Sequence, residues 1–168
     1  MFFTFVTIFY LIVYPFTYLV LFFLFPYFFG QPPTRVSWRS VPSVVFIMLL
    51  SLLFFAISAA VPDEELSNRM LHVLAGGLTA FLVCFLAMRD SKVKITKFQF
   101  IVFGALMVIA MGVANEVVEF FGQNYTTLIF AQNINDTWLD LISNTVGIII
   151  GTICLMPFFK NKDGIVKI

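Results

Sequence analysis

The fold class is decided by residues 41–61, VPSVVFIMLLSLLFFAISAAV, which contain no Asp, Glu, Lys, Arg or His. A helix of about 20 apolar residues crosses the hydrocarbon core of a bilayer. Lipid offers no partner for open backbone N–H and C=O groups, so a segment of this kind must satisfy them internally as a helix. Residues 41–61 are therefore expected to form a transmembrane helix.

Similar apolar windows lie on both sides of this segment, at residues 2–29, 70–88, 98–121 and 138–159. Of the 168 residues, 61% are hydrophobic and 11% are charged, whereas an average soluble domain has about 25% charged residues. Five spans with short connections account for the whole length. We therefore expect an all-α, polytopic transmembrane helix bundle of about five spans, with 1–168 as a single membrane domain.

The basic residues alternate between the connections. Connections 30–40 and 89–98 and the C-terminal tail are rich in Lys or Arg, whereas 62–69 is mainly acidic and 122–137 has neither Lys nor Arg. The positive-inside rule then predicts a multi-pass protein of the cell membrane with a cytoplasmic C-terminus and an external N-terminus. The net charge of +1 gives no basis for binding nucleic acid, so membrane lipids are the expected surroundings.

Polar residues mark the start of the third span. Ionisable side chains within a span cost about 2.5–3.5 kcal/mol on insertion scales and tend to face the bundle interior. Asn68, His72 and Gly76 are spaced by four residues and share one helical stripe, with Arg69 beside them. This stripe is a candidate binding surface, although a single histidine at an interface can also simply bond to a carbonyl group.

The fourth span ends with Asn115, Glu116 and Glu119. Glu116 and Glu119 are three residues apart and face the same side of a helix. Two carboxylates this close repel each other unless a proton or a cation compensates their charge. The alternative is that Glu119 reaches the membrane interface and only Glu116 is buried.

The last span opens with an acidic stripe. Asp136, Asp140 and Asn144 are spaced by four residues, and Gly147 and Gly151 form a small-xxx-small pattern that allows close helix contact. Asp136 could serve merely as a helix cap, whereas Asp140 lies a full turn further in. Under the predicted orientation all three polar stripes lie on the external side, so they are expected to meet in one pocket.

This pocket predicts three kinds of site residue. The candidate catalytic residues are His72, Glu116 and Asp140. The candidate substrate-binding residues are Asn68, Arg69, Asn115, Asp136 and Asn144. A divalent metal ion is the candidate cofactor, held through oxygen by Glu116, Glu119 and Asp140.

Three motifs resemble the VanZ-like membrane protein family. That family's pattern is Asp-Lys-x-x-His at the start of one span, Glu-x-x-Gln at the end of the next, and Asp-x-x-x-Asn-x-x-Gly-x-x-x-Gly in the last. The corresponding segments here are 68–72 (NRMLH), 116–119 (EVVE) and 140–151 (DLISNTVGIIIG). Segments 115–119 (NEVVE) and 136–140 (DTWLD) are also similar to YjdF-like inner-membrane proteins.

The resemblance covers a VanZ-like core at residues 60–155. It implies a role in the cell envelope, with an envelope lipid or lipid-linked precursor as substrate, in a family named after a glycopeptide-resistance protein. Two other hypotheses stay open beside an enzyme. The pocket could bind or transport a cation or a drug without catalysis, or the polar stripes could only hold the helices together.

Overall fold

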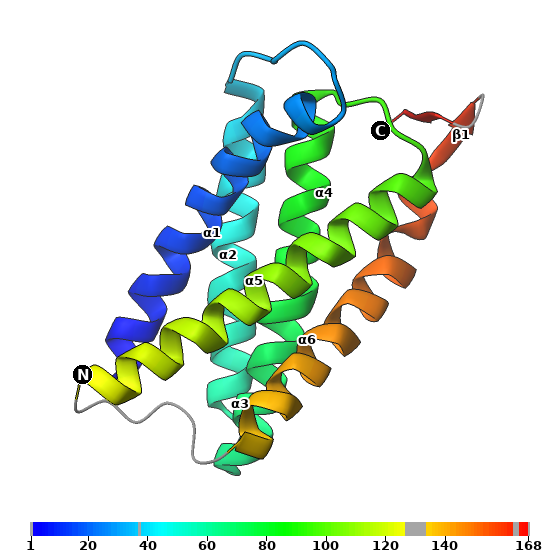
Figure 1. Ribbon diagram of the computed structural model, residues 1–168. Coiled ribbons are helices and arrows are strands. Elements are labelled where there is room, and N and C mark those ends of the chain that lie inside the picture. The colour runs from blue at the N-terminus through cyan, green and yellow to red at the C-terminus, as the bar shows by residue number, and fades with distance from the viewer. Residues whose placement is uncertain (1, 37, 127–133, 163–164, 168) are drawn as a thin grey trace.

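The computed structural model describes residues 2–36, 38–126, 134–162 and 165–167 and is a bundle of long helices (Figure 1). The helices are α1 (Phe2–Phe28), α2 (Val41–Ala59), α3 (Glu64–Leu71), η2 (His72–Thr79), α4 (Ala80–Ser91), α5 (Lys97–Tyr125) and α6 (Ile134–Leu155). The short elements are the 3₁₀ turns η1 (Trp38–Ser40) and η3 (Met156–Phe158) and a hairpin of β1 (Lys160–Lys162) and β2 (Ile165–Lys167). The segment η2 is a π-helix that joins α3 to α4.

Five helical stretches of the described chain are long and apolar enough to cross a membrane. They are Leu11–Phe28, Val41–Ala59, Glu64–Ser91, Lys97–Tyr125 and Asn135–Phe158. This confirms the predicted all-α bundle of five spans, to which the structure adds the small C-terminal hairpin. Large apolar side chains such as Leu49, Leu53 and Ile153 point outward, as a lipid-facing surface requires.

Local capping signals set two of the helix starts. The third span begins at Glu64, before the predicted residue 70, because the Asp63 side chain accepts a hydrogen bond from the Leu66 amide (2.7 Å) and caps α3. Before α5, Thr96 and Gln99 form a capping box in which each side chain accepts from the other's backbone N–H (2.8 and 3.1 Å). Both helices therefore start where their unsatisfied N–H groups find side-chain partners.

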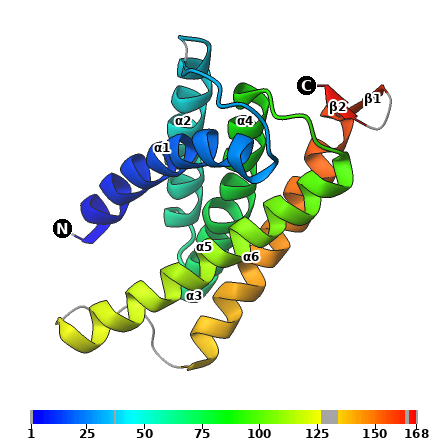
Figure 2. The same cartoon turned by 45° about the horizontal axis from the view of Figure 1, so that its top comes forward.

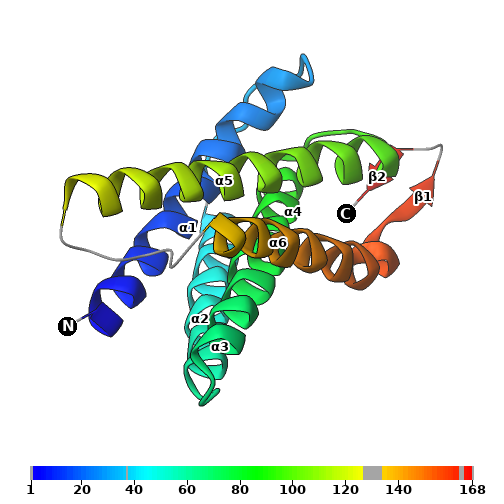
Figure 3. The same ribbon diagram turned by 60° about the horizontal axis from the view of Figure 1, so that its bottom comes forward.

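The third span lies at the centre of the bundle. Within its most apolar window 61% of residues are buried, against 33% at most in the other four spans. The helix α1 packs against α4 and α2, and α6 crosses η2 at close range (Figure 3). Every other span therefore takes its position from the α3–η2–α4 segment.

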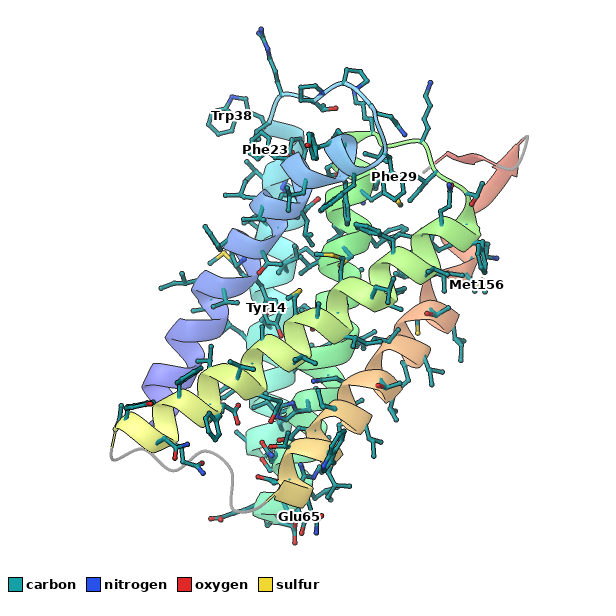
Figure 4. All side chains as sticks on the ribbon, viewed as in Figure 1. Tyr14, Phe23, Phe29, Trp38, Glu65 and Met156 are labelled. Carbon is teal, nitrogen blue, oxygen red and sulfur yellow. The ribbon has the colours of Figure 1, made fainter. Side chains whose placement is uncertain are left out.

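The chain runs up and down, so α3, the last turns of α5 and the first turns of α6 lie at one end of the bundle (Figures 1 and 2). We call this the site end; Glu65 lies there, and Met156 lies near the opposite end (Figure 4). The opposite end carries the connection between α1 and α2 and the C-terminal hairpin. The three polar stripes are thus on one side of the bundle.

The opposite half of the bundle is packed with aromatic rings. Phe103 of α5 contacts the rings of Phe25, Phe28 and Phe29 at the end of α1, with centroids 5.2–5.4 Å apart. A second aromatic cluster joins α4, α5 and the chain after α6 through Phe81, Phe85, Phe100, Phe158 and Phe159. These contacts fix the helices at the end away from the polar stripes.

Candidate functional site

Three spans each contribute one buried ionisable residue to a common cluster. His72 comes from η2, Glu116 from α5 and Asp140 from α6, and one ligand atom of each lies within 4.8 Å of the other two. The exposed fractions of these residues are 8%, 9% and 2%. The structure therefore brings together the three residues that the sequence analysis singled out as candidate catalytic groups.

Asp140 is the most connected member of the cluster. Its Oδ1 accepts hydrogen bonds from the Arg69 guanidinium and from Asn68 Nδ2 (3.2 Å), and His72 Nε2 lies 3.4 Å away. A buried carboxylate is costly unless it is paired and hydrogen-bonded, and here it receives both kinds of partner. Asp140 thus joins the start of the third span to α6.

Arg69 links both aspartates of α6. Besides Asp140 it forms an ion pair with the Asp136 carboxylate and donates to the Asp136 carbonyl oxygen (3.2 Å). Its contact with Glu65 is longer, at 3.9 Å, and Glu65 is largely exposed. Arg69 and Asp136 are both predicted substrate-binding residues, and in this structure they bind each other.

Glu119 lies beside the cluster rather than in it. Its Oε1 accepts a hydrogen bond from Asn115 Nδ2 (2.7 Å), one turn earlier on α5. This bond draws the carboxylate along the helix surface. In the described part of the chain, the ligand atoms that come together belong to His72, Glu116 and Asp140, and the predicted metal ligand Glu119 is not among them.

Two oxygen atoms at the site are buried without a hydrogen-bond partner among the described residues, Glu116 Oε1 and Asn144 Oδ1. More than nine tenths of buried polar groups in proteins have a partner, so each exception needs an explanation. Glu116 and Asn144 are 9% and 4% exposed. Arg69 Nε is a third buried polar atom of this kind. His72 lies near Asn144. Thr137 and Asn115 lie near Glu116. The two oxygens therefore have polar neighbours but no hydrogen bond of good geometry.

Glycines hold Asn144 in its position. A Cβ atom added to Gly76 would lie 2.0 Å from Asn144 Oδ1, and one added to Gly112 would lie 2.9 Å from Asn144 Nδ2. The amide is thus inserted between η2 and α5, where only glycine leaves room. Gly76 was part of the predicted stripe, but Gly112 was missed, and its only sequence signal is a glycine in the middle of an apolar span.

A cavity of about 290 Å³ adjoins the cluster. His72, Asn144 and the predicted substrate-binding residue Asn115 contribute polar groups to its wall, and α5 also contributes apolar residues such as Met111 and Val118. Val13, Tyr14 and Thr17 of α1 line another side, and small residues of the third span and α5 complete the wall. The sequence analysis assigned no role to α1, because its apolar run contains no motif.

The chain matches a protein-family model over residues 3–161, which includes every helix that forms the cluster and the cavity. It belongs to the family described as Predicted membrane protein (DUF2238). Neither the curated proteins nor the solved structures contain a significant match. For this DUF2238 protein the comparison therefore supports a membrane protein family, over a longer region than residues 60–155, and gives no support to the VanZ-like or YjdF-like name.

Proposed function

We propose that this DUF2238 protein is a membrane-embedded enzyme that acts on the polar head group of an envelope lipid or lipid-linked precursor. The observation that carries the proposal is that His72 and Asn144 belong to two features at once. They lie in or beside the buried cluster of ionisable groups, and they line the cavity of about 290 Å³. A molecule in the cavity would therefore touch His72, one of the three candidate catalytic groups.

The chemistry would centre on the pair formed by His72 and Asp140. A histidine oriented by a carboxylate is a common general base, and it must lie within hydrogen-bonding reach of the proton that it takes. Asp140 Oδ1 is 3.4 Å from His72 Nε2, and Arg69 and Asn68 hold Asp140 in place. His72 would accept a proton from water or a hydroxyl group in the cavity, with Glu116 as the second acid or base.

The cavity walls favour an amphiphilic substrate. Ligand pockets are mainly apolar, with a few polar groups that fix orientation. Here Val13, Met111 and Val118 supply apolar surface from α1 and α5, opposite the polar wall at His72 and Asn144. An acyl or prenyl chain would lie against the apolar walls while the head group reaches His72.

The orientation predicted from the Lys and Arg distribution would place this pocket in the external leaflet, where envelope precursors are used. The aromatic clusters that fill the opposite half of the bundle favour a one-sided pocket over a path through the protein. This is the reason for preferring an enzyme or binding site to a transporter.

The proposal is tested by incubating the purified full-length protein, in proteoliposomes, with an extract of envelope lipids and following the lipids by mass spectrometry. We expect one lipid class to be converted. General acid–base groups contribute about 10²- to 10⁴-fold to rates, so His72→Gln should slow the conversion by that factor.

Glu64→Gln is the matched control, because Glu64 is an exposed acid at the same end of the bundle. It should convert the lipid at the wild-type rate. If a lipid copurifies with the wild-type protein and is never converted, the protein binds lipid and is not the proposed enzyme. Conversion that is unaffected by His72→Gln would remove the proposed base.

A further inference from the structure

The buried cluster has the donor set of a metal site. His72 offers an imidazole nitrogen, and Glu116 and Asp140 offer carboxylate oxygens, from three different spans. Two ligands of a tetrahedral Zn²⁺ ion, each about 2.0–2.2 Å from the metal, lie about 3.3–3.6 Å apart. The donor atoms lie within 4.8 Å of one another, so side-chain rotations that close at most about 1.5 Å would bring them to coordinating distance.

The atoms without partners strengthen this interpretation. Glu116 Oε1 is buried and has no hydrogen-bond partner among the described residues, and the same holds for Asn144 Oδ1. The contacts of Asp140 with Arg69, Asn68 and His72 that the structure describes all fall on Oδ1, which leaves Oδ2 to turn toward an ion. A cation between these residues would satisfy oxygens that the protein leaves unsatisfied.

The local charge also favours a cation. Four carboxylates interact electrostatically across the cluster, those of Glu116, Glu119, Asp136 and Asp140. Arg69 is the cationic side chain that pairs with two of them, Asp136 and Asp140. These carboxylates repel one another and are costly to ionise together inside an apolar bundle, so a proton or a cation has to compensate an excess of negative charge. A divalent ion would offset this excess where burying unpaired charge is most costly.

We propose that His72, Glu116 and Asp140 bind a first-row divalent cation, Zn²⁺ or Mn²⁺, with Asn144 Oδ1 beside it as a further oxygen donor. One imidazole with several oxygens suits these ions better than Ca²⁺ or Mg²⁺, which prefer oxygen alone, or Cu(I), which prefers sulfur. With Asn144 counted, four protein donors would surround the ion, and two of them, His72 and Asn144, also line the cavity. With the ion bound, His72 and Glu116 would be ligands and would not also serve as the acid–base pair proposed above; binding of the ion itself is tested without any lipid.

The experiment uses the purified full-length protein in detergent. Isothermal titration with Zn²⁺ and with Mn²⁺, together with elemental analysis of the dialysed protein, should give one ion per chain. Removing a residue that only hydrogen-bonds to a metal ligand lowers metal affinity about 10- to 100-fold. Glu116→Gln removes a ligand itself, so it should lower the affinity for the ion at least about 100-fold. X-ray absorption of the bound ion should show one imidazole nitrogen and oxygen donors, without sulfur.

Two control variants decide between ligand sets. Glu64→Gln changes an exposed acid at the same end and should bind the ion as the wild type does. The loss of metal affinity caused by Glu119→Gln should be smaller than that caused by Glu116→Gln by a factor of at least about ten. The reason is that Glu119 bonds to Asn115 outside the cluster. Equal losses in these two acids of α5 would show that the ligand set is wrong.

The ion-free Glu116→Gln protein should be folded, because the change replaces an acid whose Oε1 has no partner among the described residues. If this variant does not fold, X-ray absorption on the wild type still tests the ligands. A wild-type protein that binds neither ion stoichiometrically, or binds one through sulfur, would overturn the proposal. If lipid is converted without a bound ion, the metal site is wrong and the proposal that His72, oriented by Asp140, acts as a base still stands. If an ion binds but no lipid is converted, the metal site stands and only the proposed enzymatic function is wrong.

Discussion

At the scale of single residues, Arg69 joins the third span to both aspartates of α6 at the site end. It pairs with Asp136 and Asp140, and Asp140 in turn contacts Asn68 and His72. The side chains of Arg69 and Asp140 are 17% and 3% exposed, so water screens the Asp140 carboxylate little. Without the guanidinium, the buried carboxylate would lose its positive partner.

Arg69→Ala is expected to lower the free energy of unfolding by about 3–5 kcal/mol, the usual cost of breaking a buried ion pair by removing one partner. Thermal unfolding of the purified protein in detergent measures this loss. The double variant Arg69→Ala, Asp140→Asn should be more stable than the single variant, because the more deeply buried of the two carboxylates that pair with Arg69 is then neutral. Additive losses in the two variants would contradict the ion-pair explanation.

Asp90 plays the corresponding part at the opposite end. Its Oδ2 accepts hydrogen bonds from Tyr18 of α1 (2.6 Å) and Ser43 of α2 (2.5 Å), and its Oδ1 accepts one from Arg89 (2.9 Å). Tyr18 is fully buried. The carboxylate therefore holds α1, α2 and α4 together away from the site.

Tyr18→Phe keeps the ring and removes only the hydroxyl group. Hydrogen bonds to charged groups contribute about 1.5–3 kcal/mol, so we expect the free energy of unfolding to fall by about this amount while metal binding stays unchanged. Thermal unfolding and titration of the variant measure the two effects. A weakened metal affinity would show that the two ends are coupled.

At the scale of elements, the contact between η2 and α6 decides how closely the site residues approach. A Cβ atom on Gly147 would lie 2.2 Å from the Val73 carbonyl oxygen and 2.6 Å from Gly77 Cα, so the two backbones touch. The helix η2 is a π-helix of eight residues, and π-helical turns occur frequently at functional sites. His72 and Gly76 both lie on it, so the glycine contact brings the His72 helix against the Asp140 helix.

Gly147→Ala and Gly151→Ala form a matched pair one turn apart on α6. Gly147→Ala must push backbone atoms apart, and overpacking of this kind costs about 1–3 kcal/mol. At Gly151 the nearest atom is 3.0 Å away and belongs to the movable Phe81 ring. We expect a clearly lower melting temperature for Gly147→Ala than for Gly151→Ala, and the reverse order would contradict the backbone contact.

At the scale of the whole molecule, the alternation of the five spans sets which polar groups can meet. The third span starts, the fourth ends and the fifth starts at the site end (Figures 1 and 2). The apolar outer surface and the aromatic packing of the other half leave the polar groups concentrated at this end. The distribution of Lys and Arg predicts that the site end faces outward.

Cysteine labelling in intact cells tests this orientation. The two native cysteines are first removed by Cys84→Ser and Cys154→Ser. A single cysteine is then introduced at one of two exposed positions, Glu64→Cys at the site end or Lys94→Cys at the opposite end (Figure 1). A membrane-impermeant maleimide should label Glu64→Cys directly and Lys94→Cys only after the membrane is made permeable. The opposite pattern would place the site on the cytoplasmic side.

The sequence by itself determined the five spans and the stripes of polar residues, because the length of an apolar run and the helical period are local properties of the chain. It also put the stripes at one end, since spans joined by short connections must alternate. Only the tertiary structure decided that His72 rather than Glu119 meets Glu116 and Asp140, and that α1 lines the cavity. These outcomes depend on how far each helix rotates about its axis and how closely glycines let the helices approach, and contacts between distant parts of the chain fix both.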